Sequence, residues 1–259
     1  MSCCPVVELR QYTLRPETRD ALVDLFETNL LESQEELDMT VLGIFRELDN
    51  PDAFVWLRGF PDMVTRTASL TAFYQGPVWE KTRNAVNDTI VNSDNVLLLR
   101  PARQGSDFVV NGSPAPSRDG GVVGDRGAIE IIVCSFGSAA AAERALARSD
   151  SELVLAFAAA GGAVLAYFLT EESENAYPAL PIRENEHVLL VVVGYNDRAA
   201  YEAGSPAIAG ARKAFVRMTE IPSPPEIIRL VPTSRSRLTG SSEPCLSARD
   251  ALTGRARET

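Results

Sequence analysis

Charged and aromatic side chains alternate along two predicted strands in the first quarter of the chain. On one of them Glu8, Arg10 and Tyr12 are two residues apart, and on the other Trp56 and Arg58 keep the same spacing. Successive side chains of a strand point to opposite faces of a sheet, so each set shares one face. Charges on a central strand must be paired or wetted, because burying an isolated charge costs many kcal/mol. The pattern therefore predicts one polar cluster over one sheet.

The composition of this cluster favours an anionic ligand. One carboxylate beside two guanidiniums leaves a surplus of positive charge, which suits a carboxylate, an enolate or a phenolate. We expect Arg10 and Arg58 to stabilise developing oxyanion charge, and Glu8 or Tyr12 to move a proton. Trp56 would supply a flat apolar wall. The alternative, weighted equally, is a structural ion pair beside a core tryptophan.

A second set of candidates lies on a predicted helix. Trp79, Arg83 and Asn87 are four residues apart and so share one stripe. An aromatic ring, a cation and an amide on one stripe could roof a pocket over the sheet. Taken alone, this stripe favours the other interpretation, in which the tryptophan is packed and the arginine solvated.

The predicted elements of the first half return in the same order in the second half. The order is strand, helix, strand, strand, helix, strand, which is that of a ferredoxin-like unit. In the first half the strands are expected at 6–14, 40–48, 53–60 and 95–100, and the helices at 18–34, 62–74 and 77–88. In the second half the strands are expected at 128–136, 163–171, 186–195 and 226–232, and the helices at 138–160, 197–201 and 206–218. The fold class is therefore α+β, with two tandem ferredoxin-like repeats.

These repeats divide the chain into four parts. They are a repeat carrying the site at 1–102, a Gly/Pro-rich linker at 103–126, a degenerate repeat at 127–233, and a polar tail at 234–259 that is expected to be disordered or loosely draped.

The second repeat lacks most of the polar cluster. At the aligned positions it has Glu130, Ile132, Cys134, Val191 and Val193. We therefore expect a single site, in the first repeat, and a larger loss of activity for Arg58→Ala than for Arg212→Ala.

Composition narrows the classes of partner. The chain has 259 residues, of which 45% are hydrophobic and 23% charged, an ordinary globular profile. Its formal net charge of -10 disfavours nucleic acids and anionic membranes. No apolar run is long enough to span a bilayer, and the first residues do not resemble a signal peptide, so a cytoplasmic protein is expected. A small-molecule substrate is the expected partner, and exposed strand edges would permit a homodimer.

The four cysteines give no sign of a metal site. They show no CxxC spacing and no cluster with the single histidine, so neither a metal nor a cofactor is expected. The adjacent pair Cys3 and Cys4 could be reactive, but a reduced, frayed N-terminus is the favoured interpretation.

Several separate blocks of the first repeat resemble the NIPSNAP family. The blocks lie at 7–12, 45–48, 54–62, 76–79 and 93–99. The resemblance covers about residues 6–102 and places the chain in the dimeric α+β barrel superfamily, which implies two sheets packed face to face, here both from one chain. Phe45 and Tyr74 are also expected to bind substrate, beside Arg10, Trp56, Trp79, Arg83 and Asn87 named above.

The superfamily also suggests an activity. Its members include cofactor-free monooxygenases, cyclases and isomerases, and the resemblance implies an enzyme of this kind acting on a small, partly aromatic or enolisable anionic metabolite, in bacterial specialised metabolism. Other members bind haem through a histidine, for which this chain offers only His187. A non-catalytic small-molecule-binding barrel is the remaining alternative.

Overall fold

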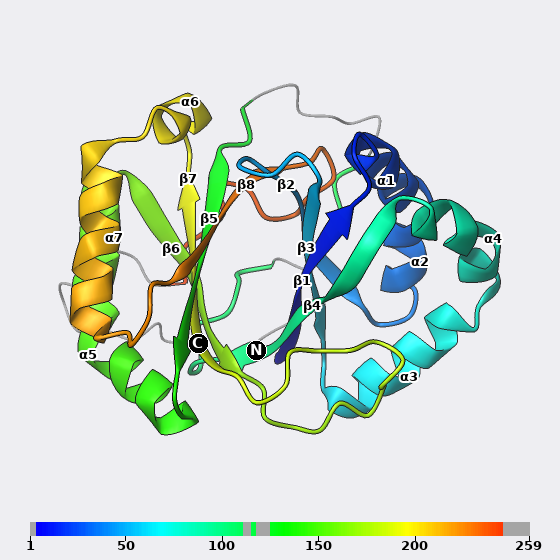
Figure 1. The fold of residues 1–259 in the computed structure, drawn as a ribbon, viewed down its shortest axis with the longest axis horizontal. Helices are drawn as coiled ribbons and strands as arrows, with labels where there is room; N and C mark the ends of the chain where they lie inside the picture. Colours follow the sequence, from blue (N-terminus) through cyan, green and yellow to red (C-terminus); the bar gives the residue numbers. More distant parts are fainter. Residues whose placement is uncertain (1–3, 111–114, 118–124, 246–259) are drawn as a thin grey trace.

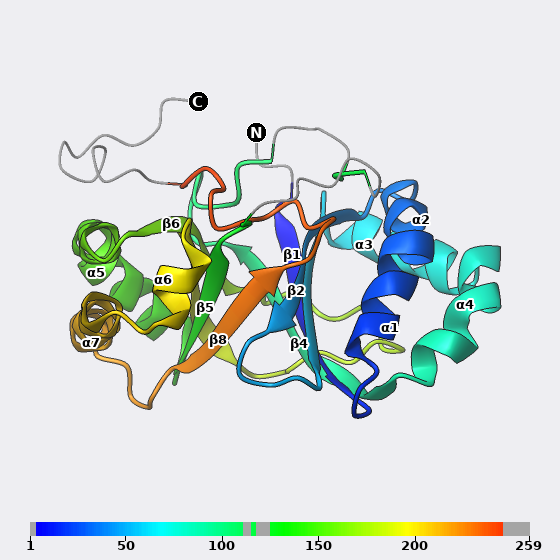
Figure 2. The same ribbon diagram turned by 90° about the horizontal axis from the view of Figure 1, so that it is seen from above.

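The computed structural model describes residues 4–110, 115–117 and 125–245, and these form one eight-stranded closed barrel with helices on its outside (Figures 1 and 2). The first repeat comprises β1 (Val6–Leu14), α1 (Arg19–Leu25), η1 (Phe26–Leu30), α2 (Leu31–Glu35), β2 (Thr40–Glu47), β3 (Ala53–Phe60), α3 (Met63–Tyr74), α4 (Pro77–Asn87) and β4 (Ile90–Pro101). The second comprises β5 (Ala128–Phe136), α5 (Ala139–Ala159), β6 (Gly162–Thr170), β7 (His187–Tyr195), α6 (Arg198–Glu202), α7 (Pro206–Thr219) and β8 (Glu226–Pro232).

The strand order β1-β3-β2-β8-β5-β7-β6-β4 confirms two ferredoxin-like repeats that share one barrel. Within each repeat the first and third strands are central neighbours, and every pairing is antiparallel. Figure 1 shows α1 to α4 packed on one side of the barrel and α5 to α7 on the opposite side. Each repeat therefore has its own layer between sheet and helices.

Alternation along the strands separates an apolar barrel interior from these outer layers. Val7 and Leu9 of β1 and Val55 and Leu57 of β3 point into the barrel, where they join the apolar core. The intervening side chains, including the polar set, face the helices. The predicted cluster consequently lies in the layer between the first sheet and its helices, outside the barrel interior.

The two seams between the repeats are short. β2 meets β8, and β4 meets β6, over three residue pairs each. Connecting segments extend both seams. The backbone N–H of Leu238 donates to the carbonyl of Leu42, and the backbone N–H of Tyr167 donates to the carbonyl of Ser106. In the described part of the chain the sheet therefore closes on itself, which corrects the expectation of exposed edges for a homodimer.

The connecting segments pack more closely than their composition suggested. Phe108, in the Gly/Pro-rich segment, and Leu238, in the polar tail, are both buried in the barrel core. Arg235 and Arg237 of the tail form ion pairs with Glu32 and Glu35 of α2. The described residues 234–245 are therefore bound to the body by basic side chains meeting acidic ones, and residues 246–259 lie outside the described residues.

Helix ends follow local sequence. The carboxylate of Asp62 accepts a hydrogen bond of 2.6 Å from the backbone N–H of Thr65, which caps α3, and Pro77 occupies the first turn of α4. No helix among the described residues is long and apolar enough to cross a membrane.

Candidate functional site

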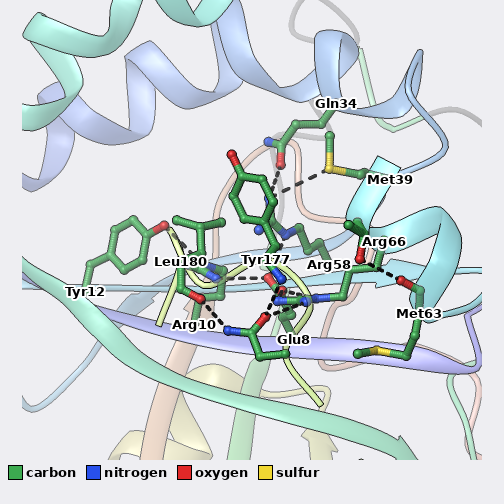
Figure 3. Close-up of polar contacts among 12 residues, drawn as sticks. Glu8, Arg10, Tyr12, Gln34, Met39, Arg58, Met63, Arg66, Tyr177 and Leu180 are labelled. Atoms are coloured by element: carbon green, nitrogen blue, oxygen red, sulfur yellow. Dashed lines mark hydrogen bonds and ion pairs between the residues drawn. The ribbon is translucent and has the colours of Figure 1, made fainter. Parts of the chain in front are cut away.

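The first repeat holds a carboxylate ringed by three arginines (Figure 3). Glu8 Oε2 accepts hydrogen bonds from Arg10 Nη1 at 3.0 Å and from Arg58 Nε at 2.8 Å. Its other oxygen accepts one from Arg66 Nε at 2.7 Å. Glu8, Arg10, Arg58 and Arg66 are all 0% exposed. The arrangement is a buried cluster with one negative and three positive charges, which we call the arginine cluster.

The strand register explains how this cluster forms. Glu8 lies directly opposite Arg58 in the β1–β3 pairing, and Arg10 lies opposite Trp56. Directly opposed side chains on one face of an antiparallel pair are about 5 Å apart, close enough for an ion pair. Arg66 comes from the first turns of α3, which the cap at Asp62 places over the same face.

The cluster fixes the ionisation of its carboxylate. Burial alone would raise the pKa of Glu8. The three neighbouring cations, Arg58, Arg10 and Arg66, lower it by more than burial raises it, so this pKa lies well below its usual range. Glu8 stays ionised and is unsuited to accept a proton. The pKa of Arg10 is raised, because Tyr12 and Glu8 outweigh the effect of burial.

Two positive charges remain uncompensated within the described cluster. Arg58 donates Nη1 to Gln34 Oε1 at 3.1 Å and approaches Met39 Sδ at 3.8 Å, but its buried Nη2 has no hydrogen-bond partner among the described residues. An unpaired buried donor of a charged group is costly in the folded state. Excess charge and a free donor together favour binding of an anion.

An aromatic cavity of about 130 Å³ adjoins the arginine cluster. It is lined by Tyr12, Leu22, Phe26, Leu30, Gln34, Trp56, Phe73, Tyr74, Trp79, Val86, Asn87, Ile90, Ser93 and Leu180. The guanidinium of Arg58 lies 5.0 Å from the ring centre of Trp56, and Arg10 Nε donates to the Tyr12 hydroxyl at 3.1 Å. The arginines therefore lie directly behind two lining residues and act on the cavity through them.

The rings around the cavity contact one another edge to face. Tyr74 lies 4.9 Å from Trp79 at 80° and 5.1 Å from Phe73 at 89°, while Phe26 lies 4.8 Å from Trp56 at 67°. Burial raises the pKa of Tyr74, so its hydroxyl stays protonated and remains a donor. A ligand entering here would meet ring edges and faces on several sides.

A short π-helical turn interrupts the helix predicted at 18–34. This turn, η1, carries Phe26 and Leu30, and both line the cavity. Such π-bulges are rare and occur frequently at functional sites. The helical periodicity gave no sign of this interruption.

The second repeat also contributes to this site, which sequence reasoning missed. The connection between β6 and β7, residues 171–186, crosses to the first repeat, and Figure 1 shows it in yellow-green reaching towards α3. Asn175 Oδ1 accepts a hydrogen bond from Arg66 Nη1 at 3.0 Å, and Leu180 lines the cavity. We call residues 172–185 the strap. The one feature of the sequence that indicates the strap is the length of the connection between the two strands, because hairpin loops normally have two to five residues.

Most of the candidate residues are brought together. Glu8, Arg10 and Arg58 form the arginine cluster, and the lining includes Tyr12, Trp56, Tyr74, Trp79 and Asn87. Arg66 and Gln34 were missed, since neither shares a strand face with the cluster, and each arrives from a helix whose packing the sequence does not specify.

Two candidates lie elsewhere. Phe45 of β2 points into the barrel interior, because strand alternation places it on the face opposite the arginine cluster. Arg83 is exposed on α4 and does not line the cavity, because Thr82 and Val86 are the residues that α4 buries. These positions correct the assignment of both residues to substrate binding.

We expect Arg83→Ala to leave ligand binding unchanged. The side chain is solvated and has no contact with the cavity, so affinity should stay within about twofold of wild type. Titration of the variant with an aromatic acid, followed by tryptophan fluorescence, measures this. A larger loss would show that α4 presents Arg83 to the ligand.

The second repeat has a charge-balanced counterpart of the arginine cluster. Buried Glu130 accepts hydrogen bonds from Arg212 Nε at 2.9 Å and from the Tyr201 hydroxyl at 2.7 Å. Burial and the neighbouring Glu130 raise the pKa of Tyr201 above its usual range. Arg212 thus belongs to a separate polar cluster in the second repeat and not to the arginine cluster. One carboxylate and one arginine leave no surplus charge.

The second repeat also has the larger cavity, of about 420 Å³. Its lining is Ile132, Arg212, Lys213, Phe215, Val216, Arg217, Pro224, Pro225 and Ile227. Arg212 is already paired with Glu130, and the other side chains form an apolar floor with exposed cations beside it. Volume alone would favour this groove, but the buried surplus charge favours the first repeat.

The residues present do not fit a haem. His187, the single histidine, forms a contact of 3.6 Å between Nδ1 and Glu172 Oε1, and the cavity it lines is only about 10 Å³. Cofactor sites usually need several hundred Å³. No group of metal-binding side chains occurs among the described residues either.

Comparisons with known proteins agree with the first repeat's motifs. Residues 7–103 match the family model described as NIPSNAP. The matched segment coincides with the first repeat. A search of curated proteins gave no match.

Solved structures extend the likeness beyond the NIPSNAP domain to the whole barrel. A protein described as a "putative monooxygenase" from Lactobacillus acidophilus NCFM matches with a TM-score of 0.52 and 15% identity, over 91% of this chain and 98% of its own. Another described in the same words, from Fusobacterium nucleatum subsp. nucleatum, gives 0.54 and 9%, over 94% and 99%. An uncharacterized NIPSNAP-like domain protein from Burkholderia xenovorans gives 0.37 and 22%, over 44% and 96%. The first two share the fold of both repeats.

Proposed function

We propose that the NIPSNAP domain binds a small aromatic or enolisable anion in its cavity and acts on it without a cofactor, by cyclisation, isomerisation or monooxygenation. The observation that carries this proposal is the arginine cluster, which has three buried arginines for one buried carboxylate, directly behind an aromatic cavity. A net positive charge held out of water stabilises a ligand's negative charge more strongly than the same charge in solvent.

The cavity limits the size of this ligand. Its volume of about 130 Å³ is close to that of an apolar cavity which holds one benzene ring. A single-ring acid or phenol therefore matches both its size and its charge. Specialised metabolism is a proposal that follows from this substrate class and from the family resemblance.

The role that we assign to Glu8 differs from the role expected from the sequence. Glu8 holds the arginines in place, because its depressed pKa keeps it from accepting a proton at neutral pH. Tyr12 already accepts from Arg10, so its own O–H is oriented by a cation and can donate to the ligand's oxygen. Arg10 and Arg58 stabilise charge on that oxygen, and Tyr12 is the candidate for proton transfer.

Benzoate and its neutral isostere benzamide test the charge requirement. The chain's two tryptophans are Trp56 and Trp79, and both line the cavity, so intrinsic fluorescence reports directly on its occupancy. Benzoate should quench or shift this emission at concentrations at least roughly tenfold lower than benzamide, since a hydrogen bond to a charged group contributes about 1.5–3 kcal/mol. Equal fluorescence responses to benzoate and benzamide would contradict the proposal that the cavity binds an anion.

The pH dependence of binding should follow the ligand and not Glu8. With a phenol acidic enough to ionise below about pH 8 as probe, affinity should rise as pH increases through the phenol's own pKa and then stay level to about pH 9, because the depressed pKa of Glu8 and the raised pKa of Arg10 both lie outside that window. Isothermal titration calorimetry across this range measures the profile. A decline in affinity as the phenolate forms would contradict it.

Turnover separates an enzyme from a simple binding protein. Hydroxylated aromatic acids that pass the binding test should be incubated with the protein in air and under nitrogen, and the products followed by NMR. A product formed only in air indicates monooxygenation, and one formed in both indicates cyclisation or isomerisation. Tight binding with no product in either atmosphere would leave the non-catalytic barrel as the function.

A further inference from the structure

We infer that the strap, residues 172–185 of the second repeat, sets the size of ligand that the first repeat accepts, with Leu180 as the specificity-determining residue and Asn175 as a positioning residue. This inference rests on the proposed function, because it concerns the same cavity. It assigns the second repeat a part in recognition, although the buried Glu130–Arg212 pair of that repeat carries no surplus charge.

The strap is tied to the first repeat at both ends. Glu171, just before it, donates its backbone N–H to the carbonyl of Leu98 at 2.9 Å, and Arg183 donates to Val96 at 2.8 Å. Both acceptors lie on β4 of the first repeat. The connection between two neighbouring strands of the second repeat thus follows a strand of the other repeat.

One amide side chain connects the middle of the strap to the arginine cluster. Asn175 Oδ1 accepts hydrogen bonds from Arg66 Nη1 at 3.0 Å and from the backbone N–H of Tyr177 at 3.2 Å. Its Nδ2 donates to the carbonyl of Leu180 at 2.9 Å. Asn175 therefore fixes the position of Leu180 relative to the same arginines that favour an anion.

The strap closes the cavity with apolar groups. Leu180 is its contribution to the lining, and the ring of Tyr177 stacks against that of Tyr74, 6.1 Å between centres at 24°. Figure 3 shows Tyr177 and Leu180 in the same region as Arg10 and Arg58. The other walls are the first sheet and the helices packed on it, so the strap offers the side on which a larger ligand can be admitted.

Leu180→Ala tests this role by enlarging the cavity at its strap side. The probes are benzoate, with one ring, and 1-naphthoate, with two, and calorimetry gives both affinities. The ratio of naphthoate to benzoate affinity should rise at least about tenfold over wild type, because the second ring becomes buried where it was excluded. A ratio within about twofold of wild type would overturn the inference.

Ile182→Ala is the matched control. It removes a similar apolar volume from the same strap, but Ile182 packs against the neighbouring core and does not line the cavity. Its ratio should equal that of wild type, and a rise equal to that of Leu180→Ala would show a general loosening instead of a size limit.

Asn175→Ala tests the positioning role, with Glu174→Ala, exposed on the same strap, as control. Stopped-flow tryptophan fluorescence should show at least about fivefold faster benzoate dissociation for the first variant and an unchanged rate for the second. Equal rates in Asn175→Ala and wild type would overturn this role. The proposed function and the role of the strap can be contradicted separately. If the wild-type protein does not prefer benzoate over benzamide, the proposed function is wrong. If benzoate binding depends on Arg58 but Leu180→Ala leaves the naphthoate-to-benzoate ratio unchanged, only the role of the strap is wrong.

Discussion

Glu8→Gln should lower the free energy of unfolding by about 3–5 kcal/mol, which is the range for removing one partner of a buried ion pair. The substitution keeps the shape of the side chain but leaves Arg10, Arg58 and Arg66 buried with no negative charge among them. Urea denaturation followed by circular dichroism measures the change.

Glu130→Gln in the second repeat is the matched control. Its partner Arg212 has a side chain that is 27% exposed and can turn towards water, so the loss should be smaller, about 1–3 kcal/mol. Equal losses at the two positions would show that the arginine cluster carries no special excess of charge.

The difference between wild type and Glu8→Gln should also depend on pH. The pKa of Glu8 is depressed in the folded protein, so its contribution to stability is complete above the ordinary value of 4.5 and declines as pH falls below it. The gap in unfolding free energy should therefore narrow between about pH 5 and pH 3. A gap that widens in acid would contradict the direction of the shift.

Arg58→Met should abolish most ligand binding while leaving the protein as stable as wild type or more so. Exchanging a buried charge that is in excess for an apolar side chain of similar length is often neutral or stabilising. Losing one of the two surplus positive charges behind the cavity should weaken benzoate binding roughly 10- to 100-fold. Calorimetry and urea denaturation on the same samples measure both quantities.

Arg212→Met should show the reverse pattern. Glu130 would lose its arginine and remain buried, so stability should fall, while the first repeat's cavity and benzoate affinity stay unchanged. If Arg58→Met loses stability as well as binding, the arginine cluster is a structural ion-pair network, and the functional interpretation of its surplus charge is wrong.

Local periodicity was sufficient for the architecture and for the centre of the site. Alternation in β1 and β3 placed Glu8, Arg10 and Arg58 on one face, and the fold's strand order made those strands neighbours. The same alternation, applied to β2, would have placed Phe45 in the barrel interior, since it occupies the opposite face from the polar set.

The remaining parts of the site depend on contacts between distant segments. Arg66 and Gln34 reach the cluster only through the packing angle of α3 and α2 on the sheet, which no local pattern specifies. The strap is further removed, because Asn175 meets Arg66 across the boundary of the two repeats. Likewise, the basic residues at 235 and 237 indicated attraction to an acidic body, but not which helix they would meet.

The short seams bear on how the chain folds. Phe45 of β2 pairs with Pro232 of β8, so the barrel closes only when residues near opposite ends of the chain have met. Contacts of such sequence separation slow folding. During synthesis the first repeat emerges before its partner exists, with Val7, Leu9 and Leu57 on an uncovered apolar face. The apolar face of the nascent first repeat therefore stays uncovered until the second half of the chain has been made.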